Sequence, residues 1–173
     1  MSPRRIRRER TRGWRLPEGA KIVDRTSRWG NPFKIGELVS DVTPYAPTHP
    51  YDGPLDPGVY NVAGVDGEPR TYRVWTVQSR AEAVDLFRVW IRYHDDVFPL
   101  ERIRRELGGR DLACWCPLPI PGQPDICHAA VLLALSNPGL PDPSRYPQGP
   151  KPYGWPYRCI KNVADRTVVG GVL

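Results

Sequence analysis

The stretch Asp111-Leu-Ala-Cys-Trp-Cys-Pro117, followed after a loop by Cys127-His-Ala-Ala-Val-Leu-Leu-Ala-Leu-Ser136, decides the fold class of this 173-residue chain. The first segment is short, apolar and closed by a proline, which is typical of a buried β-strand. The second is a longer apolar run that stops at Asn137-Pro138, and this predicts a helix. A strand that leads through a loop into a helix is the building unit of α/β sheets, so the chain is expected to be an α/β protein.

The rest of the core, residues 16–137, is consistent with this class. Ser79 and Glu82 form a capping box ahead of a predicted helix, and Pro99 opens a second, shorter one. Strands are expected at residues 20–24, 58–62, 71–77 and 111–116, and residues 37–77 are interpreted as a loop and hairpin insertion with a turn at Asp66-Gly67. The predicted fold is a small single α/β domain with a short mixed sheet and about three helices.

The positive charge of the chain lies in its first 15 residues, here called the basic arm. Residues 1–15 hold seven arginines against one acid, Glu9, which equals the net charge of +6. Such an arm would bind the phosphates of a nucleic acid or nucleotide through counterion release, and the alternative is a solvated segment that aids solubility. The arginines are Arg4, Arg5, Arg7, Arg8, Arg10, Arg12 and Arg15. At the other end, residues 138–173 are rich in proline and are expected to form an extended tail.

The cysteines are expected to be reduced. No apolar run approaches the ~20 residues of a membrane span, and no signal-peptide hydrophobic region follows the basic arm. A cytoplasmic location is therefore expected, where four cysteines are ligands or reactive thiols in preference to disulfides.

Four metal-type donors lie within fifteen residues: Cys114, Cys116, Cys127 and His128. Ligands of α/β sheets bind at the carboxyl ends of strands, so these residues are expected to share one site that binds zinc. Two features of the spacing complicate this prediction. A regular strand would hold the sulfurs of Cys114 and Cys116 too far apart unless the chain curls at Pro117, and Cys127 and His128 are adjacent, so Cys159 is an alternative ligand.

Two other uses of these residues stay open. In the first, Cys116 or Cys127 is the nucleophile of a cysteine-dependent enzyme acting on a nucleotide-like small molecule, with His128 as its acid-base partner. The position of Cys127 at a helix N-terminus predicts a lowered pKa for its thiol. In the second, the cysteines only fill the core of a noncatalytic structural or interaction module.

The loop from Arg25 to Phe33 is a second candidate site, because it also leaves the end of a predicted strand. Arg25 and Arg28 would hold a phosphate or a carboxylate, Trp29 would stack on a base, and Asn31 would supply an amide. The alternative is a surface turn that Trp29 anchors in the core. With the basic arm and the cysteines, the loop leads to the expectation of a zinc-binding protein that binds or acts on a nucleotide or nucleic acid.

The chain resembles a family known as domain of unknown function 4326, which has actinobacterial and phage members. The resemblance rests on the motifs Arg12-Gly-Trp-Arg-Leu-Pro17, Arg28-Trp-Gly-Asn-Pro-Phe33, the helix from Ala83 to Trp90, Gly109-Arg-Asp-Leu-Ala-Cys-Trp-Cys-Pro117 and Cys127-His-Ala129. It covers residues 12–137 and implies that Trp29 to Phe33, the three cysteines and His128 belong to one shared site. Relatives often have Asp where this chain has Ala130, and the loop before Cys127 is longer here. The family name implies no activity.

Overall fold

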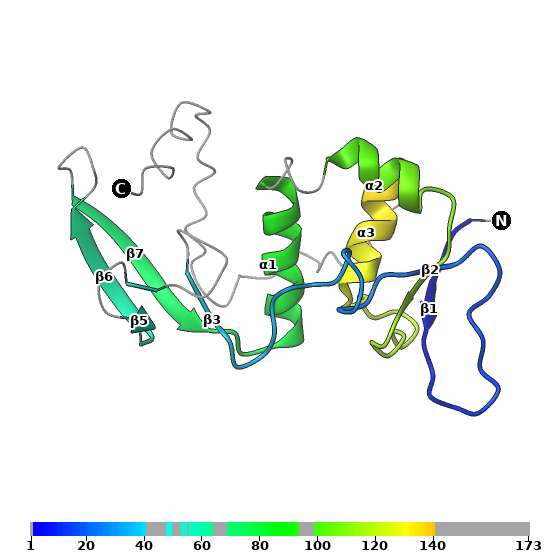
Figure 1. Cartoon of the computed structure of the whole chain (residues 1–173), viewed down its shortest axis with the longest axis horizontal. Coiled ribbons are helices and arrows are strands. Elements are labelled where there is room, and N and C mark those ends of the chain that lie inside the picture. Colours follow the sequence, from blue (N-terminus) through cyan, green and yellow to red (C-terminus); the bar gives the residue numbers. More distant parts are fainter. Residues whose placement is uncertain are drawn as a thin grey trace. The chain divides into compact units, whose positions relative to one another are not determined.

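The chain folds into two compact units, seen in a computed structural model that describes residues 2–40, 48–49, 53–54, 56–63, 69–93 and 99–140 (Figure 1). The first unit holds the described residues up to 36 and from 77 to 140, and the second holds the described residues between 37 and 76. The expected turn at Asp66-Gly67, Cys159 and most of the expected proline-rich tail lie outside the described residues.

A parallel three-stranded sheet organises the first unit. Its order is β1 (Arg5–Arg7), β8 (Leu112–Cys114) and β2 (Lys21–Ile22). All three residues of β8 are buried, as expected of the central strand of a parallel sheet. Because the strands are parallel, their carboxyl ends lie at one edge, which is where the chain enters both candidate site segments.

Strand β1 comes from the segment expected to be a basic arm. Arg5 pairs with Leu112 and Arg7 with Cys114 in parallel register. Arg5 and Arg7 are two residues apart and therefore share a face of the strand, yet Arg5 is buried and Arg7, at the end of the strand, is exposed. Residues 5–7 of the arm are therefore part of the sheet.

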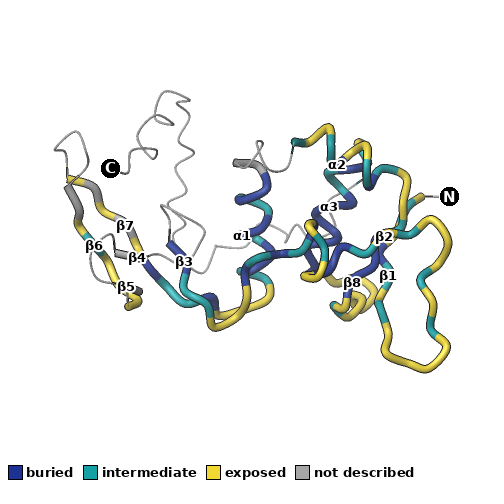
Figure 2. Tube along the Cα trace, viewed as in Figure 1, coloured by how far each residue is buried: buried dark blue, intermediate teal, exposed yellow. Residues whose placement is uncertain are grey.

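Three helices complete the first unit: α1 (Arg80–Tyr93), α2 (Leu100–Leu107) and α3 (His128–Ser136). The capping box is formed, since the Glu82 amide donates to Ser79 Oγ at 3.1 Å. Helix α3 packs against α1, α2 and β8 and is buried over most of its length (Figure 2). No helix in the described part of the chain is both long and apolar enough to cross a membrane.

The second unit is an antiparallel sheet in the order β3 (Leu38–Ser40), β7 (Pro69–Thr76) and β6 (Gly58–Ala63). Strands β6 and β7 form the expected hairpin, with Gly58 opposite Val74. Two further short strands, β4 (Thr48–His49) and β5 (Gly53–Pro54), pair with each other. The expected α/β class is confirmed. In the described residues the strands form one parallel three-stranded sheet, one antiparallel three-stranded sheet and the antiparallel pair of β4 and β5.

Candidate metal centre

Three of the four predicted metal ligands come together at the carboxyl edge of the parallel sheet. The sulfurs of Cys114, Cys116 and Cys127 all lie within 4.8 Å of one another. Cys114 is the last residue of β8, Cys116 lies in the bend that follows it, and Cys127 is the N-cap of α3. Cys114 and Cys127 are buried, Cys116 is half-buried, and all three are free thiols.

The close approach of Cys114 and Cys116 depends on a bend in the chain. In a regular strand their Cα atoms would be about 6.6 Å apart, from a rise of about 3.3 Å per residue. Here β8 ends at Cys114, the chain bends at residues 115 and 116, and the two sulfurs are 3.7 Å apart. The curl that the C-x-C spacing requires is therefore present, just before Pro117.

A buried arginine holds this bend. Arg5 donates from Nη1 to the Cys116 carbonyl at 2.8 Å and from Nη2 to the Pro117 carbonyl at 2.6 Å. Its Nε forms an ion pair at 2.5 Å with Oδ2 of Asp125, and the two side chains are only 3% and 8% exposed. The other oxygen of Asp125, Oδ1, is buried with no hydrogen-bond partner among the described protein atoms.

The sulfur spacing suits a tetrahedral metal ion. Zinc–thiolate bonds of about 2.3 Å at tetrahedral angles give sulfur–sulfur distances of about 3.8 Å. The 3.7 Å between Cys114 and Cys116 matches this edge, and Cys127 lies close to both. The three cysteines could hold a metal ion.

The three thiols differ in acidity. Hydrogen bonds from the thiols of Cys114 and Cys127 lower the pKa of Cys116. Hydrogen bonds with Cys114 and Cys116, followed by burial, raise the pKa of Cys127, and the hydrogen bond with Cys116 raises that of Cys114. The lowered pKa predicted for Cys127 is thus wrong, because its side chain makes no cap hydrogen bond to α3 and faces the other two sulfurs.

His128 is not part of the sulfur group in the described residues. Its Nε2 lies 2.6 Å from the Val23 carbonyl, and its ring meets that of Phe87 edge-on at 5.4 Å. Burial lowers the pKa of His128, so the neutral ring donates its Nε2 hydrogen to that carbonyl. Its roles as a metal ligand and as an acid-base partner stay predictions. Because Nε2 is hydrogen-bonded to Val23, either role would have to use Nδ1.

The loop from Arg25 to Phe33 uses most of its polar groups internally. Arg25 donates to the carbonyls of Asn31 at 3.1 Å and Phe33 at 2.6 Å. Asn31 is buried, donates from Nδ2 to the Ala83 carbonyl of α1 at 2.9 Å, and accepts at Oδ1 from the Phe33 amide at 2.9 Å. A Cβ at Gly30 would lie 2.5 Å from the Cα of Arg25, so only glycine fits. These contacts fix the conformation of the loop, and the hydrogen bond of Asn31 attaches it to α1.

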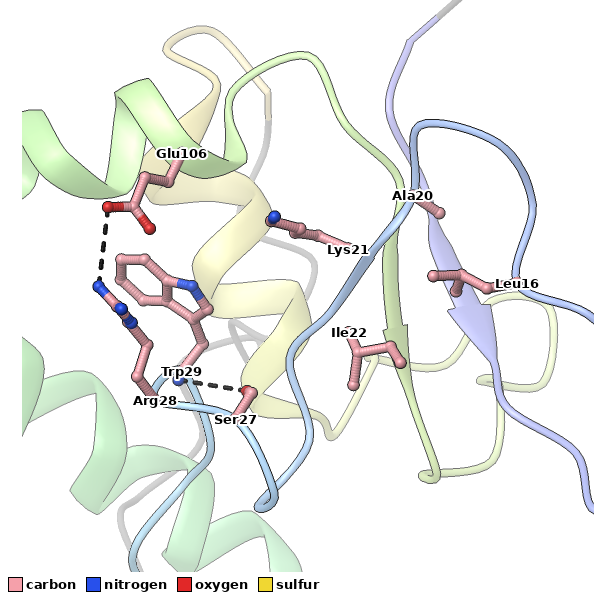
Figure 3. Close-up of a pocket in the computed structure, with 8 residues that line it drawn as sticks. All are labelled: Leu16, Ala20, Lys21, Ile22, Ser27, Arg28, Trp29 and Glu106. Carbon is pink, nitrogen blue, oxygen red and sulfur yellow. Dashed lines mark hydrogen bonds and ion pairs between the residues drawn. The ribbon is translucent and has the colours of Figure 1, made fainter.

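Trp29 and Arg28 line a depression of about 480 Å³ together with Lys21 and Glu106 (Figure 3). Trp29 is only 4% exposed, so its ring is part of the core. Arg28 lies 3.9 Å from Glu106, whose pKa is lowered first by its hydrogen bond with Arg102. Ligand binding by the four loop residues Arg25, Arg28, Trp29 and Asn31 stays a prediction.

Sequence reasoning missed Arg5 and Asp125 as parts of the site. In the sequence Arg5 is one of seven arginines of the arm, and Asp125 lies in an irregular loop. A weak signal was present, since Asp125 stands two residues before Cys127. Only the pairing of β1 with β8, more than one hundred residues away in sequence, brings the two together.

One comparison with known proteins gives a match. A family model described as domain of unknown function (DUF4326) matches residues 6–138, well over half of the chain. No curated protein and no solved structure is significantly similar to the chain.

Proposed function

Since the chain belongs to the DUF4326 family, whose function is unknown, we propose its function from the site itself. It is a metal-binding α/β protein whose Cys114, Cys116 and Cys127 bind zinc and which binds or acts on a nucleotide or nucleic acid. The observation that carries the metal part is the convergence of three sulfurs within 4.8 Å.

Zinc suits this donor set best among the common metals. Thiolates are soft ligands that favour zinc over magnesium or calcium, and iron–sulfur clusters usually take four cysteines. Three protein thiolates leave a tetrahedral zinc ion one further position, which catalytic centres keep open and structural centres close. Cys159 and the Nδ1 atom of His128 are the candidates for closing it.

Arg5 would support such a centre in two ways. Its hydrogen bonds to the carbonyls of Cys116 and Pro117 fix the bend that turns Cys116 toward the other sulfurs. Its buried positive charge also lies close enough to Cys116 and Cys127 to favour their charged forms. Asp125 in turn anchors Arg5.

The nucleotide or nucleic-acid part rests on charge. The first 15 residues account for the whole net charge of the chain, and several of their arginines are exposed beside the strand that carries Cys114. Phosphates are the ligands that such a surface favours.

Metal content tests the proposal. Elemental analysis of the full chain, purified without added metal, is expected to give about one zinc ion per chain. The double variant Cys116→Ser, Cys127→Ser is expected to lose it, while the single variants Cys159→Ser and His128→Gln report whether either residue is the fourth ligand. Loading each variant with cobalt, whose thiolate charge-transfer absorption scales with the number of bound sulfurs, separates loss of a ligand from loss of folding.

A wild-type chain that neither contains zinc nor binds cobalt would overturn the proposal. One specific observation favours the second candidate in that case, a cysteine-dependent enzyme. Cys116 is the half-buried sulfur of the three and has the lowered pKa, so it is the one suited to act as a nucleophile. Its alkylation by iodoacetamide would then be fast and nearly independent of pH between about 5 and 8, and Cys116→Ser would abolish it.

A further inference from the structure

The seven arginines of the basic arm fall into two groups. Three have acidic partners: Arg4 with Asp111, Arg5 with Asp125 and Arg8 with Asp24. The other four are exposed, and no carboxylate partner is found for them in the described part of the chain. They are Arg7, Arg10, Arg12 and Arg15. Folding therefore uses part of the charge of the arm and leaves a smaller set of cations on the surface.

These cations meet an exposed tryptophan that lies between two of the cysteines. Trp115 is 39% exposed, whereas Trp29 is 4% exposed. The guanidinium carbons of Arg8 and Arg10 lie 4.5 Å and 5.2 Å from the centre of the Trp115 ring, within the range of cation–π attraction. Arg8 is fixed by its ion pair with the buried Asp24, while Arg10 has no such restraint.

The ring and the cations share one depression of about 520 Å³. It is lined by Arg7, Arg8, Glu9, Arg10, Thr11 and Trp115. Glu9 is the one acid among these residues, and it accepts a hydrogen bond from Thr11 Oγ1 at 3.3 Å. The depression therefore combines a flat aromatic surface with an excess of positive charge.

We propose that this surface binds single-stranded nucleic acid, with one unpaired base stacked on Trp115 and the flanking phosphates held by Arg7 and Arg10. Stacking of bases on aromatic rings beside a basic groove is the usual physical basis of single-strand binding. The base takes the place of Arg10 over the ring, and Arg10 turns to a phosphate, because no carboxylate holds it. Arg8 stays in place through Asp24.

The features of the depression favour a single strand over two other partners. A base inside a duplex is stacked on its neighbours and does not present a face to Trp115, so a duplex would use only the arginines. A membrane surface would call for apolar side chains around the ring, whereas the lining of this depression is otherwise polar or charged.

This inference deepens the nucleic-acid part of the proposed function and is separable from its metal part. Trp115 lies in the bend after β8, between Cys114 and Cys116, but its ring is bounded by the residues of the arm. Substitution of Trp115 or Arg10 should therefore leave the metal content unchanged.

The experiment measures binding of the full chain to a fluorescent 15-nucleotide oligothymidine, to a duplex of the same length and to anionic phospholipid vesicles. Trp115→Ala is expected to weaken oligothymidine binding by about tenfold or more, and Trp115→Phe to retain most of it. Arg10→Ala is expected to weaken it and to reduce the dependence on salt by about 0.7 in the logarithmic slope, as loss of one phosphate contact predicts for a single strand. Arg104→Ala, which removes an exposed arginine of α2, is the matched control and should change nothing.

Three results would overturn the inference while leaving the metal centre intact. They are unchanged oligothymidine binding by Trp115→Ala, equal weakening of duplex and single-strand binding by that variant, and binding of vesicles in place of oligothymidine. Trp115→Phe serves as the check on folding, because it keeps the ring. A wild-type chain that contains no zinc and binds no cobalt would instead overturn the proposed metal function alone.

Discussion

The cysteine centre and the loop from Arg25 to Phe33 lie at the same edge of the parallel sheet but differ in how their polar groups are used. Both follow strands of one parallel sheet, β8 and β2, at the edge where ligands of α/β proteins bind. In the loop, the side chains of Asn31 and Arg25 form hydrogen bonds with backbone groups of the protein itself. In the cysteine centre, the hydrogen bonds of the three thiols in the described part of the chain stay within the group, to one another and to the Cys116 amide.

This comparison teaches that position at the sheet edge does not by itself identify a binding site. A binding site is identified by polar or nucleophilic side chains that the rest of the fold does not use for its own hydrogen bonds. The cysteine centre holds such groups in its sulfurs, and the loop holds few besides Arg28. The substitutions below test whether the first region is built for a ligand and the second for stability.

The largest effect is expected from Arg5→Met. It leaves the carboxylate of Asp125 buried without its partner and frees the bend at Cys116, so the free energy of unfolding should fall by about 4 kcal/mol. Urea unfolding measures this loss. Arg4→Met is the matched control, because its ion pair with Asp111 is exposed and should contribute less than about 0.5 kcal/mol.

A second readout of Arg5→Met connects stability to the metal. If Arg5 positions Cys116, the folded variant should bind cobalt more weakly than wild type. A double variant, Arg5→Met with Asp125→Leu, removes the orphaned charge and should recover stability without recovering affinity. Recovery of both would show that Arg5 only stabilises the fold.

Gly30→Ala is expected to have the next largest effect, about 3 kcal/mol. The new Cβ would lie 2.5 Å from the Cα of Arg25 and 2.7 Å from the carbonyl oxygen of Asp24, and backbone atoms cannot give way cheaply. The control is Gly58→Ala, whose Cβ would meet only the Tyr60 side chain at 3.5 Å. Both variants should keep the zinc content of wild type, and loss of zinc from Gly30→Ala would join the two regions into one site.

Asn31→Ala is expected to lower the free energy of unfolding by about 2 kcal/mol. It removes two buried hydrogen bonds and leaves the Ala83 carbonyl and the Phe33 amide without partners. Asn61→Ala, which removes an exposed hydrogen bond with Thr71, should cost less than about 0.5 kcal/mol. Nucleotide binding lost in Asn31→Ala at unchanged stability would instead support the ligand-binding role predicted for this loop.

The sequence predicted what depends on local pattern. The apolar run of β8, the capping box of α1 and the helix after Cys127 are local features, and all three form. Three ligands of one strand-loop-helix unit could be placed together for the same reason. The direction of the His128 ring could not, because it depends on packing against Val23 and Phe87, which are distant in sequence.

The relative pKa values of the thiols and the different environments of the arginines in the arm could not be predicted from the sequence either. A helix N-terminus lowers a thiol pKa only when the sulfur faces the free amides, and that of Cys127 does not. Arg5 and Arg7 lie on the same face of β1, yet only Arg5 is buried, where it pairs with Asp125, and no composition argument separates them. For Trp29 the sequence left base stacking and a place in the core open, and the fold buries it, whereas Trp115 is exposed; burial is a tertiary property that the sequence pattern did not decide.

The smallest effect is expected from Asp24→Asn, and it depends on pH. Burial raises the pKa of Asp24, but hydrogen bonds from the side chain and amide of Thr26 and from Arg8 outweigh it, so the pKa is lowered in the folded chain. The unfolded chain, with a pKa of about 3.9, then takes up the proton first, and stability falls as the pH drops below about 4. At pH 7 the free energy of unfolding of the variant should be about 1.5 kcal/mol lower than that of wild type, because its bond to Arg8 is weaker. At about pH 3 this difference should be smaller.

Asp56→Asn makes the same change of charge at an exposed site and controls for it. If the stabilities of Asp24→Asn and wild type stay parallel down to pH 3, the carboxylate does not hold Arg8, and Arg8 is as free as Arg10 to leave the Trp115 ring.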